Sequence, residues 1–269
     1  MCTLSAIPSL SGESIDAPGK DVILRIVFNR DEERTRPESL APALYKLGDR
    51  TVIMPLDPPS GGTWIGASDA GMVACLVNLN SGVMNLNAHV SGVVAPRVPG
   101  RLSRGLIVPE ALARQSLSSL HEWGTQLRAS DYPPFRLLLL DCERFTIFIS
   151  DGSVVTIAES GDISDPLLLA SSGLGDSLVQ EPRRRLFDQL LSSHPDRRLA
   201  QDTFHRTSWP DSMHTSVMMS RAAARTVSIT TIELSARRIE MFHEWMTDES
   251  HRAASPVSLT LPMLPKLSS

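Results

Sequence analysis

The residue after the initiator methionine is a cysteine, and this position could make it a nucleophile. Removal of Met1, which a small second side chain permits, would leave Cys2 with a free α-amine beside its thiol. The thiol has a reference pKa of about 8.5 and the amine one of about 7.7–8.0, so both react near neutral pH. An N-terminal nucleophile that uses its own amine as a base is a route to acyl transfer. Because a lone cysteine is more often inert, this hypothesis depends on the rest of the chain.

A second chemically suggestive stretch lies at the end of an apolar run. Residues 21–28 are mostly β-branched and apolar, which is typical of a buried strand. Asn29-Arg30-Asp31-Glu32 follows directly, and polar side chains at the end of a buried strand are well placed to form a site. A solvated loop after a strand would show the same pattern. The apolar run 71–78 ends in a similar way, at the amide of Asn78.

The composition is that of a soluble globular protein. The 269 residues suffice for one large domain or two small ones, with 42% hydrophobic and 21% charged residues. The net charge of −4 provides no basic surface for nucleic acid or for an anionic membrane. No nucleic-acid partner is therefore expected.

Several features indicate the cytoplasm as the location. The cysteines, Cys2, Cys75 and Cys142, are odd in number and lack metal-type spacing, which favours a reducing compartment over a disulfide framework. No apolar run reaches the length of a membrane span. The N-terminus lacks the basic and apolar regions of a signal peptide.

Other common chemistries are not supported by the motifs. His121-Glu122 and His243-Glu244 each begin like a zinc-binding helix, but Thr125 and Thr247 stand where the second histidine is needed. The glycines of residues 61–66 lack the Gly-Lys-Ser/Thr that completes a phosphate-binding loop. No Gly-x-Ser-x-Gly motif marks a serine hydrolase. We therefore expect no metal site and no cofactor.

The chain consists of alternating groups of strands and helices, without a linker or an internal repeat. This order predicts an α+β fold with mainly antiparallel sheets. A single domain should cover residues 1–255, and the proline-containing tail 256–269 should be poorly ordered. Strands are predicted at residues 1–8, 21–28, 71–78, 135–142, 145–150, 154–157, 214–220 and 226–234, and helices at residues 109–127 and 182–193.

Smaller features complete this prediction. Residues 64–65 should form a hairpin with the strand 71–78 around the turn 68–71. The proline-rich residues 35–59 read as irregular. The run Arg183-Arg184-Arg185 is expected on the solvated face of its helix.

The motifs together resemble the transport and Golgi organisation family, also called the NRDE family after its tetrapeptide. Their order and spacing match the family over the first 80 residues, and residues 135–141, 173–174 and the helix at 182 fit more loosely. The matching motifs are Met1-Cys2-Thr3, Phe28-Asn29-Arg30-Asp31-Glu32, Arg36-Pro37, Gly61-Gly62-Thr63-Trp64-Ile65-Gly66 and Val73-Ala74-Cys75-Leu76-Val77-Asn78.

The resemblance implies a fold and a set of roles. The family is similar to N-terminal nucleophile hydrolases, including bile salt hydrolases and penicillin V acylases, which implies a four-layer αββα sandwich of two antiparallel sheets. Cys2 would be the nucleophile, Arg30 would favour its thiolate, and Asn78 would donate its amide to the oxyanion. Either Asp31 or Glu32 would orient the amine or the arginine.

Three further positions are expected to support the site. Trp64 would lie near a ligand, although a tryptophan is more often part of the core. Where family members carry Gly-Leu-Ser-Asn, this chain has Asp176, and an ionised carboxylate there would repel the oxyanion. Where the family often has Arg-Thr-Asn, this chain has His214, which supplies less positive charge when neutral.

Two functions remain open from the sequence. The first is an amide-bond hydrolase that uses Cys2 on a small acyl amide. The second is a non-catalytic carrier or trafficking protein for a lipid-like or haem-like ligand on the same fold. For the first, pairing of the strands 1–8 and 21–28 should bring Arg30 beside Cys2 and lower the thiol pKa below about 8.5. Cys75 and Cys142 should be buried and slow to react.

Overall fold

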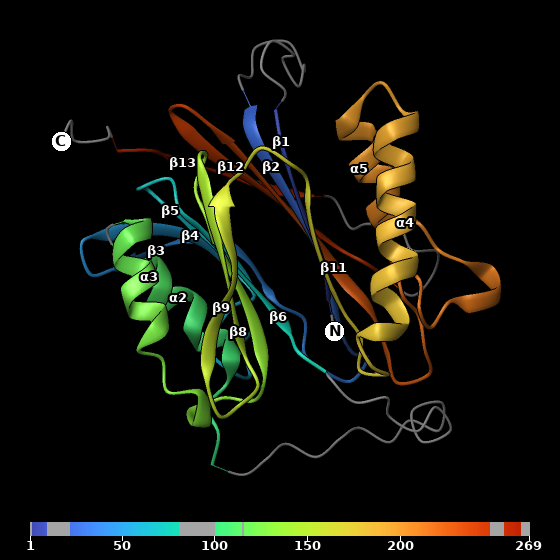
Figure 1. Ribbon diagram of the computed structural model, residues 1–269, viewed down its shortest axis with the longest axis horizontal. Helices are drawn as coiled ribbons and strands as arrows, with labels where there is room; N and C mark the ends of the chain where they lie inside the picture. Colours follow the sequence, from blue (N-terminus) through green and yellow to red (C-terminus); the bar gives the residue numbers. More distant parts are fainter. Residues whose placement is uncertain (1, 10–21, 81–99, 115, 248–255, 265–269) are drawn as a thin grey trace.

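Two antiparallel sheets pack face to face, and helices cover both outer sides (Figure 1). The computed structural model describes residues 2–9, 22–80, 100–114, 116–247 and 256–264. The architecture is the four-layer αββα sandwich that the family resemblance implies. The α+β class with antiparallel sheets, which the order of elements predicts, is confirmed as well.

The six-stranded sheet carries the N-terminal strand in its interior. Every neighbouring pair of its strands is antiparallel. Its order is β10 (Leu167–Ser171), β1 (Cys2–Pro8), β2 (Val22–Glu33), β11 (Ala224–Ser235), β12 (Arg238–Trp245) and β13 (Val257–Pro262).

The seven-stranded sheet follows the chain in order, so each strand pairs with the next one in sequence. All of these pairs are antiparallel as well. Its strands are β3 (Leu40–Leu47), β4 (Arg50–Leu56), β5 (Ile65–Ser68), β6 (Val73–Asn78), β7 (Phe135–Leu140), β8 (Arg144–Ser150) and β9 (Val155–Asp162).

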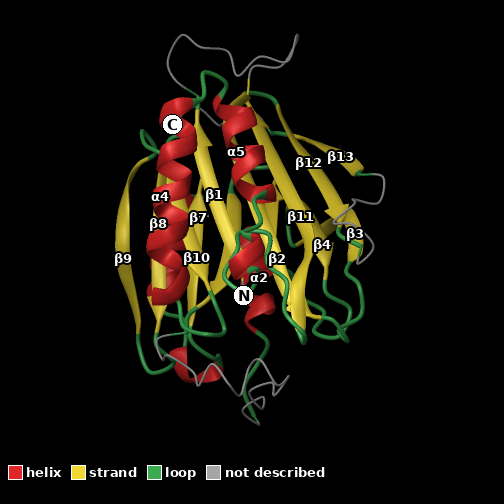
Figure 2. Ribbon diagram, turned by 90° about the vertical axis from the view of Figure 1, so that its right-hand side faces the viewer, coloured by secondary structure: helices red, strands yellow, loops and turns green. Residues whose placement is uncertain are grey.

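Helices form the outer layers on the two sheets. The helices α4 (Ser177–Ser193) and α5 (Arg197–Arg206) cover the six-stranded sheet, as Figure 2 shows from that side. The helices α2 (Ile107–Leu112) and α3 (Leu117–Thr125) pack on the seven-stranded sheet. Within the described ranges, every helix is too short or too polar to cross a lipid bilayer.

Side chains alternate along β2, so that one set faces the core between the sheets and the other faces the outer helices. Leu24, Ile26 and Phe28 belong to the core between the sheets, whereas Val27 and Asn29 face away from that core. Successive residues of a strand point to opposite faces, so Arg30 projects to the same side as Phe28. The β2 strand therefore delivers a charged side chain into the space between the two sheets.

Most predicted strands are present, but the proline-rich residues 35–59 form β3 and β4 rather than an irregular segment. Pro42 is tolerated because β3 lies at the edge of its sheet and the β3–β4 register shifts between Leu40 and Ala43. The predicted helix 109–127 is two helices, α2 and α3.

The C-terminal prediction is wrong in two places. Residues 257–262, expected to be poorly ordered, form β13 and pair with β12. Residues 214–220, expected to be a strand, contribute only an isolated bridge from Ser220 to Arg225. The sequence prediction also missed β10, β12 and α5.

Arg183 is buried, which corrects the prediction that it lies on a solvated helix face. Its exposure is 0%, and its guanidinium donates hydrogen bonds to Thr3 Oγ1 at 2.6 Å and to the Ser216 carbonyl at 2.6 Å. Burial lowers the pKa of Arg183 to about 10, so the side chain remains charged at neutral pH. Arg183 therefore ties α4 to the strand that carries Cys2.

A buried polar network ties α5 to the same strand. Asn29 Nδ2 donates to two backbone carbonyls, which leaves Asn29 Oδ1 as the acceptor for His205 Nδ1 at 2.8 Å. His205 Nε2 must then accept from the Ser5 hydroxyl at 2.7 Å. Burial holds the pKa of His205 well below its usual value, so the ring stays neutral and the network stays intact.

Candidate functional site

Cys2 occupies the first position of β1, between two neighbouring strands. Its backbone pairs with Ser171 of β10 on one side and with Arg30 of β2 on the other. The Cys2 nitrogen donates a hydrogen bond to Ser171 Oγ at 3.1 Å. The side chain belongs to the core between the sheets and is only 7% exposed. The pairing of Cys2 with Arg30 that the sequence predicts is therefore present; Met1 lies outside the described residues.

Arg30 is held by two carboxylates and an aromatic ring. Its Nη2 lies 2.8 Å from Asp57 Oδ1 and 3.4 Å from Glu32 Oε2. The guanidinium carbon lies 4.4 Å from the centroid of the Trp64 ring, at cation–π distance. These contacts fix a positive charge on the strand beside Cys2. Of the residues predicted to support the site, Glu32 and Trp64 thus contact Arg30.

Asp57 organises this cluster, and the sequence prediction missed it. Arg36 donates to both Asp57 oxygens, at 2.9 and 2.6 Å, and the Ser60 hydroxyl donates at 2.5 Å. Burial alone would raise the pKa of Asp57, but the hydrogen bonds from Arg36 and Ser60 and the charge of Arg30 hold it below its usual value. The carboxylate is therefore ionised and matches the two guanidinium groups.

The expected low pKa of the Cys2 thiol is wrong. Burial raises the pKa above its usual value, and the nearby charge of Asp31 acts in the same direction. The charge of the N-terminal amine and, to a smaller extent, that of Arg30 lower the pKa, but not enough to offset the burial. Cys75 is fully buried, and burial raises the pKa of its thiol further. Cys142 is only partly buried, contrary to the prediction.

The raised pKa predicts how Cys2 reacts with an alkylating reagent. Its labelling by iodoacetamide should accelerate steadily from about pH 7 to about pH 9, because the thiolate fraction keeps rising below the pKa. Arg30→Met should slow labelling further, since a charge that favours the thiolate is lost. Peptide mass mapping at a series of pH values measures the rate. A plateau reached below about pH 8 would contradict the burial argument.

Asn78 is the last residue of β6, the strand that faces β1 across the core. Its side chain is half-buried and makes no hydrogen bond to another residue in the described part of the chain. An amide that has no protein acceptor is available to donate to a bound oxygen atom. The Asn78 side-chain amide is therefore available for its predicted role as an oxyanion donor.

Asp176 is buried, and both of its carboxylate oxygens have partners. Its Oδ2 lies 2.8 Å from Arg136 Nη1, and its Oδ1 accepts from the Ser172 N–H at 2.8 Å. The Asn80 N–H donates to Oδ2 at 3.1 Å. Arg136 thus compensates the charge that would otherwise repel an oxyanion, and Asp176 joins the end of β6 to the start of α4.

The structure does not bring the His214 side chain into this group of residues. The side chain is exposed, and only the backbone carbonyl of His214 is used, as the acceptor for Arg221 Nε at 3.0 Å. Arg221 Nη2 also donates to Ser172 Oγ at 3.1 Å, one residue beyond the partner of Cys2. Arg221, which the sequence prediction missed, therefore places a guanidinium near the start of β1, whereas His214 does not.

Asp31 contacts different residues from Glu32. Its Oδ1 accepts a hydrogen bond from Thr226 Oγ1 at 2.7 Å, on the neighbouring strand β11. Burial raises the pKa of Asp31, and the charges of Arg183 and Arg221 counteract this effect. Of the two carboxylates left open by the sequence, Glu32 contacts Arg30, whereas Asp31 contacts Thr226 and lies near the charges of Arg183 and Arg221.

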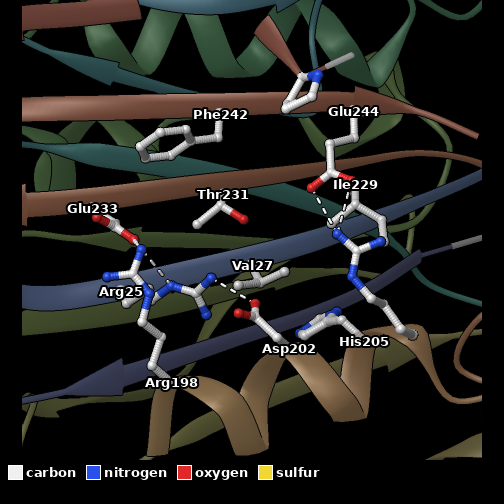
Figure 3. Close-up of a pocket in the computed structure, with 12 residues that line it drawn as sticks. Arg25, Val27, Arg198, Asp202, His205, Ile229, Thr231, Glu233, Phe242 and Glu244 are labelled. Carbon is white, nitrogen blue, oxygen red and sulfur yellow. Dashed lines mark hydrogen bonds and ion pairs between the residues drawn. The ribbon is translucent and has the colours of Figure 1, made fainter. Parts of the chain in front are cut away.

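A separate pocket of about 190 Å³ lies on the outer face of the six-stranded sheet, beside α5 (Figure 3). Val27 and Thr231 lie between two groups of charged side chains, and Ile229 lies beside Glu244. Arg25 pairs with Asp202 at 2.6 Å. Arg206 donates to both oxygens of Glu244. Arg198 pairs with Glu233, so each charged group of the pocket has a partner of opposite sign. The sheet separates this pocket from the face to which Cys2 points.

Cysteine, histidine and carboxylate side chains are the usual protein ligands of metal ions. Within the described residues, no three of them lie close enough together to hold a metal ion. The arrangement around Cys2 is instead a thiol with Arg30 on the neighbouring strand and the amide of Asn78 on the facing strand, which suits attack on a carbonyl group and stabilisation of the resulting negative charge.

Comparison with known proteins places this arrangement in a family and a fold. The family model described as Transport and Golgi organisation 2 matches residues 14–249. No curated protein sequence matches the chain.

Solved structures reveal the same fold at low identity. One is a Caenorhabditis elegans N-acylethanolamine-hydrolyzing acid amidase ortholog, with a TM-score of 0.53 and 11% identity over 86% of this chain and 92% of that chain. Another is a variant of conjugated bile acid hydrolase from Clostridium perfringens, with a TM-score of 0.51 and 10% identity over 96% and 92% of the two chains. The sandwich is thus that of the N-terminal nucleophile hydrolases.

Proposed function

The chain belongs to the Transport and Golgi organisation 2 family, and from its fold and its Cys2 site we propose that it is an N-terminal nucleophile hydrolase of acyl amides. The observation that carries this proposal is the placement of Cys2. It is the first residue of an interior strand, in register with Arg30 and opposite the strand that ends at Asn78. An amide hydrolase of this type needs a nucleophile, a fixed positive charge and an oxyanion donor at one place.

The reaction follows from the chemistry of a terminal cysteine. After removal of Met1, the Cys2 amine takes the thiol proton while the sulfur attacks the carbonyl carbon of the amide. The Asn78 amide donates to the oxygen that becomes negative, and the C–N bond then breaks as the amine leaves with the proton. Water hydrolyses the remaining thioester, which releases a carboxylic acid and restores the thiol. One water molecule is consumed for each amide cleaved.

The other residues position the reacting groups and balance the nearby charges. Ser171 accepts from the Cys2 nitrogen at 3.1 Å and would orient the amine after processing. Asp57 and Trp64 fix the Arg30 guanidinium, whose charge favours the thiolate against the cost of burial. Arg136 neutralises Asp176 near the strand end that carries Asn78.

The names of the structural relatives suggest the first substrates to test. Purified protein that begins at Cys2 should be incubated with a panel of N-acyl amides that includes N-acylethanolamines and conjugated bile acids. Release of the free amine and the free acid in equal amounts, measured by mass spectrometry, is the expected result. A processed protein that releases no amine from any of these amides would contradict the proposal.

Burial of the Cys2 thiol favours one alternative, a carrier of a lipid-like or haem-like ligand that does not react. A carrier would return its ligand chemically unchanged, and Cys2→Ala would leave ligand retention intact. The same panel separates the two functions, because mass spectrometry distinguishes an amide that is bound and recovered from one that is cleaved.

A further inference from the structure

Arg104 lies close to the candidate site and has no role in the proposed reaction. It begins the 3-10 helix η1 (Arg104–Leu106), which packs against the chain just before Trp64. The Thr63 N–H donates to the Gly105 carbonyl at 2.9 Å. A Cβ atom on Gly62 would lie only 2.4 Å from the Gly105 carbonyl carbon, so Gly62 is needed for this close approach. The contact fixes η1 beside the tryptophan that supports Arg30.

The guanidinium of Arg104 also reaches the strand end that carries Asn78. Arg104 Nη1 donates to the Pro134 carbonyl at 2.9 Å. The same carbonyl accepts from the N–H of Leu79, the residue after Asn78, at 3.2 Å. Arg104 is near enough to Cys2 and Glu32 for their charges to raise its pKa, although burial lowers it overall. Its positive charge therefore lies near the place where the proposed reaction occurs.

Arg104 differs from Arg30, Arg36, Arg136 and Arg183 in what it binds. Arg30, Arg36 and Arg136 each form an ion pair with a buried carboxylate, and Arg183 is fully buried among hydrogen-bond acceptors. Arg104 makes a single hydrogen bond and no ion pair with any residue that the structure describes.

This incomplete pairing points to a ligand. A guanidinium has five N–H donors, and partial burial of its charge is costly unless an anion compensates it. Arg104 is partly exposed, and none of its nitrogens is among the fully buried atoms without a partner. Its remaining donors are therefore accessible to a bound molecule.

We propose that Arg104 is a specificity residue that binds a carboxylate of the substrate. The inference rests on the proposed amide hydrolysis and narrows its substrates to acyl amides that carry a negative charge near the scissile bond. A planar guanidinium matches the two oxygens of a carboxylate. A single available positive charge beside Glu32 also suits a monoanion better than a doubly charged phosphate, which Glu32 would repel.

The test compares amides that differ only in charge. One pair is an N-acylglycine and its neutral N-acylglycinamide, with the charge on the amine side. The other pair is a succinyl amide and the matching butyryl amide, with the charge on the acyl side. In at least one pair, the wild-type protein should show a kcat/KM at least about tenfold higher for the charged amide, since a charge-assisted hydrogen bond contributes about that factor or more.

Variants of Arg104 should change this ratio in a graded way. Arg104→Met should lower the ratio of charged to neutral kcat/KM by about 10- to 100-fold, and Arg104→Lys by less, because lysine keeps the charge without the planar fork. The matched control is Arg101→Met on the same segment, since Arg101 donates to the Tyr132 carbonyl and lies outside the proposed site. This control should leave the ratio unchanged.

The outcomes separate the two proposals. If the wild-type protein cleaves amides but shows no preference in either pair, or if Arg104→Met and Arg104→Lys leave a preference unchanged, the role of Arg104 is overturned and the hydrolase proposal stands. If the processed wild-type protein cleaves none of the four amides and none of the wider panel, both are overturned. Should Arg104→Met fail to fold, the ratio measured with Arg104→Lys decides.

Discussion

Cys2→Ala is expected to lower kcat/KM for amide hydrolysis by at least about 10³-fold, down to the residual rate that binding and oxyanion stabilisation alone support. Alanine removes the sulfur that forms the thioester, and no other described cysteine can replace it. Cys75 is fully buried within β6, and Cys142 lies in the turn between β7 and β8. The measurement is the initial rate of amine release at several substrate concentrations.

Two further variants make this result specific to Cys2. Cys142→Ser changes a partly buried thiol in the turn after β7, away from the end of β6 that carries Asn78, and should leave the rate within about twofold of the wild-type rate, because no proposed step uses this thiol. Cys2→Ser keeps a hydroxyl nucleophile, which is weaker than a thiol near neutral pH, and should retain only a small residual activity. If Cys2→Ala kept more than about a tenth of the wild-type kcat/KM, the nucleophile would have to be another group.

Asp57→Ala is expected to destabilise the protein by about 3–5 kcal/mol, the range for removal of one partner from a buried ion pair. The Asp57 side chain is 6% exposed and accepts hydrogen bonds from Arg30, Arg36 and Ser60. Alanine would leave both guanidinium groups without their main acceptor, in a place that water reaches poorly. Urea denaturation followed by circular dichroism gives the free energy of unfolding.

A surface ion pair provides the matched control for Asp57. Asp162 pairs with Arg144 at 3.8 Å, and its side chain is 88% exposed. Asp162→Ala should change the free energy of unfolding by less than about 1 kcal/mol, because exposed pairs contribute little. Equal effects of the two substitutions would show that the cluster around Arg30 is not a buried, coupled unit. Asp57→Ala should also reduce hydrolysis in the fraction that remains folded, since it releases Arg30.

The sequence was sufficient to predict the central pair of residues. Apolar, β-branched residues from position 22 onward identify β2, and the antiparallel pairing of β1 with β2 follows from their lengths and their order. Together these features place Arg30 opposite Cys2. The sequence could not indicate how deeply Cys2 is buried, because burial depends on the second sheet, and this burial reverses the predicted direction of the thiol pKa.

Other errors arise where charged residues lie inside the fold. The run of three arginines predicts a solvated helix face. Arg183, however, lies four residues from both Val179 and Phe187, which are buried on the same side of α4. That spacing was the signal that could have identified it. The missed strand β12 also had a signal, because Ile239, Met241 and His243 alternate as its buried positions.

Asp57 and Arg104 carry no comparable signal. Each stands in a segment rich in prolines or glycines, where neither helical nor strand periodicity indicates the direction of a side chain. Their roles arise from contacts with distant parts of the chain, Asp57 with Arg30 and Arg104 with Pro134. Only the three-dimensional arrangement of the two sheets brings these residues together.

The central claim is that Cys2 becomes the N-terminal residue and acts through its own amine. The most direct test is peptide mass mapping of the N-terminus in protein isolated from its native cells. The account predicts a terminal peptide that begins at Cys2 with a free α-amine. A terminal peptide that retains Met1 in all of the protein would contradict the account, because the nitrogen of Cys2 would then remain locked in a peptide bond and could not serve as the base.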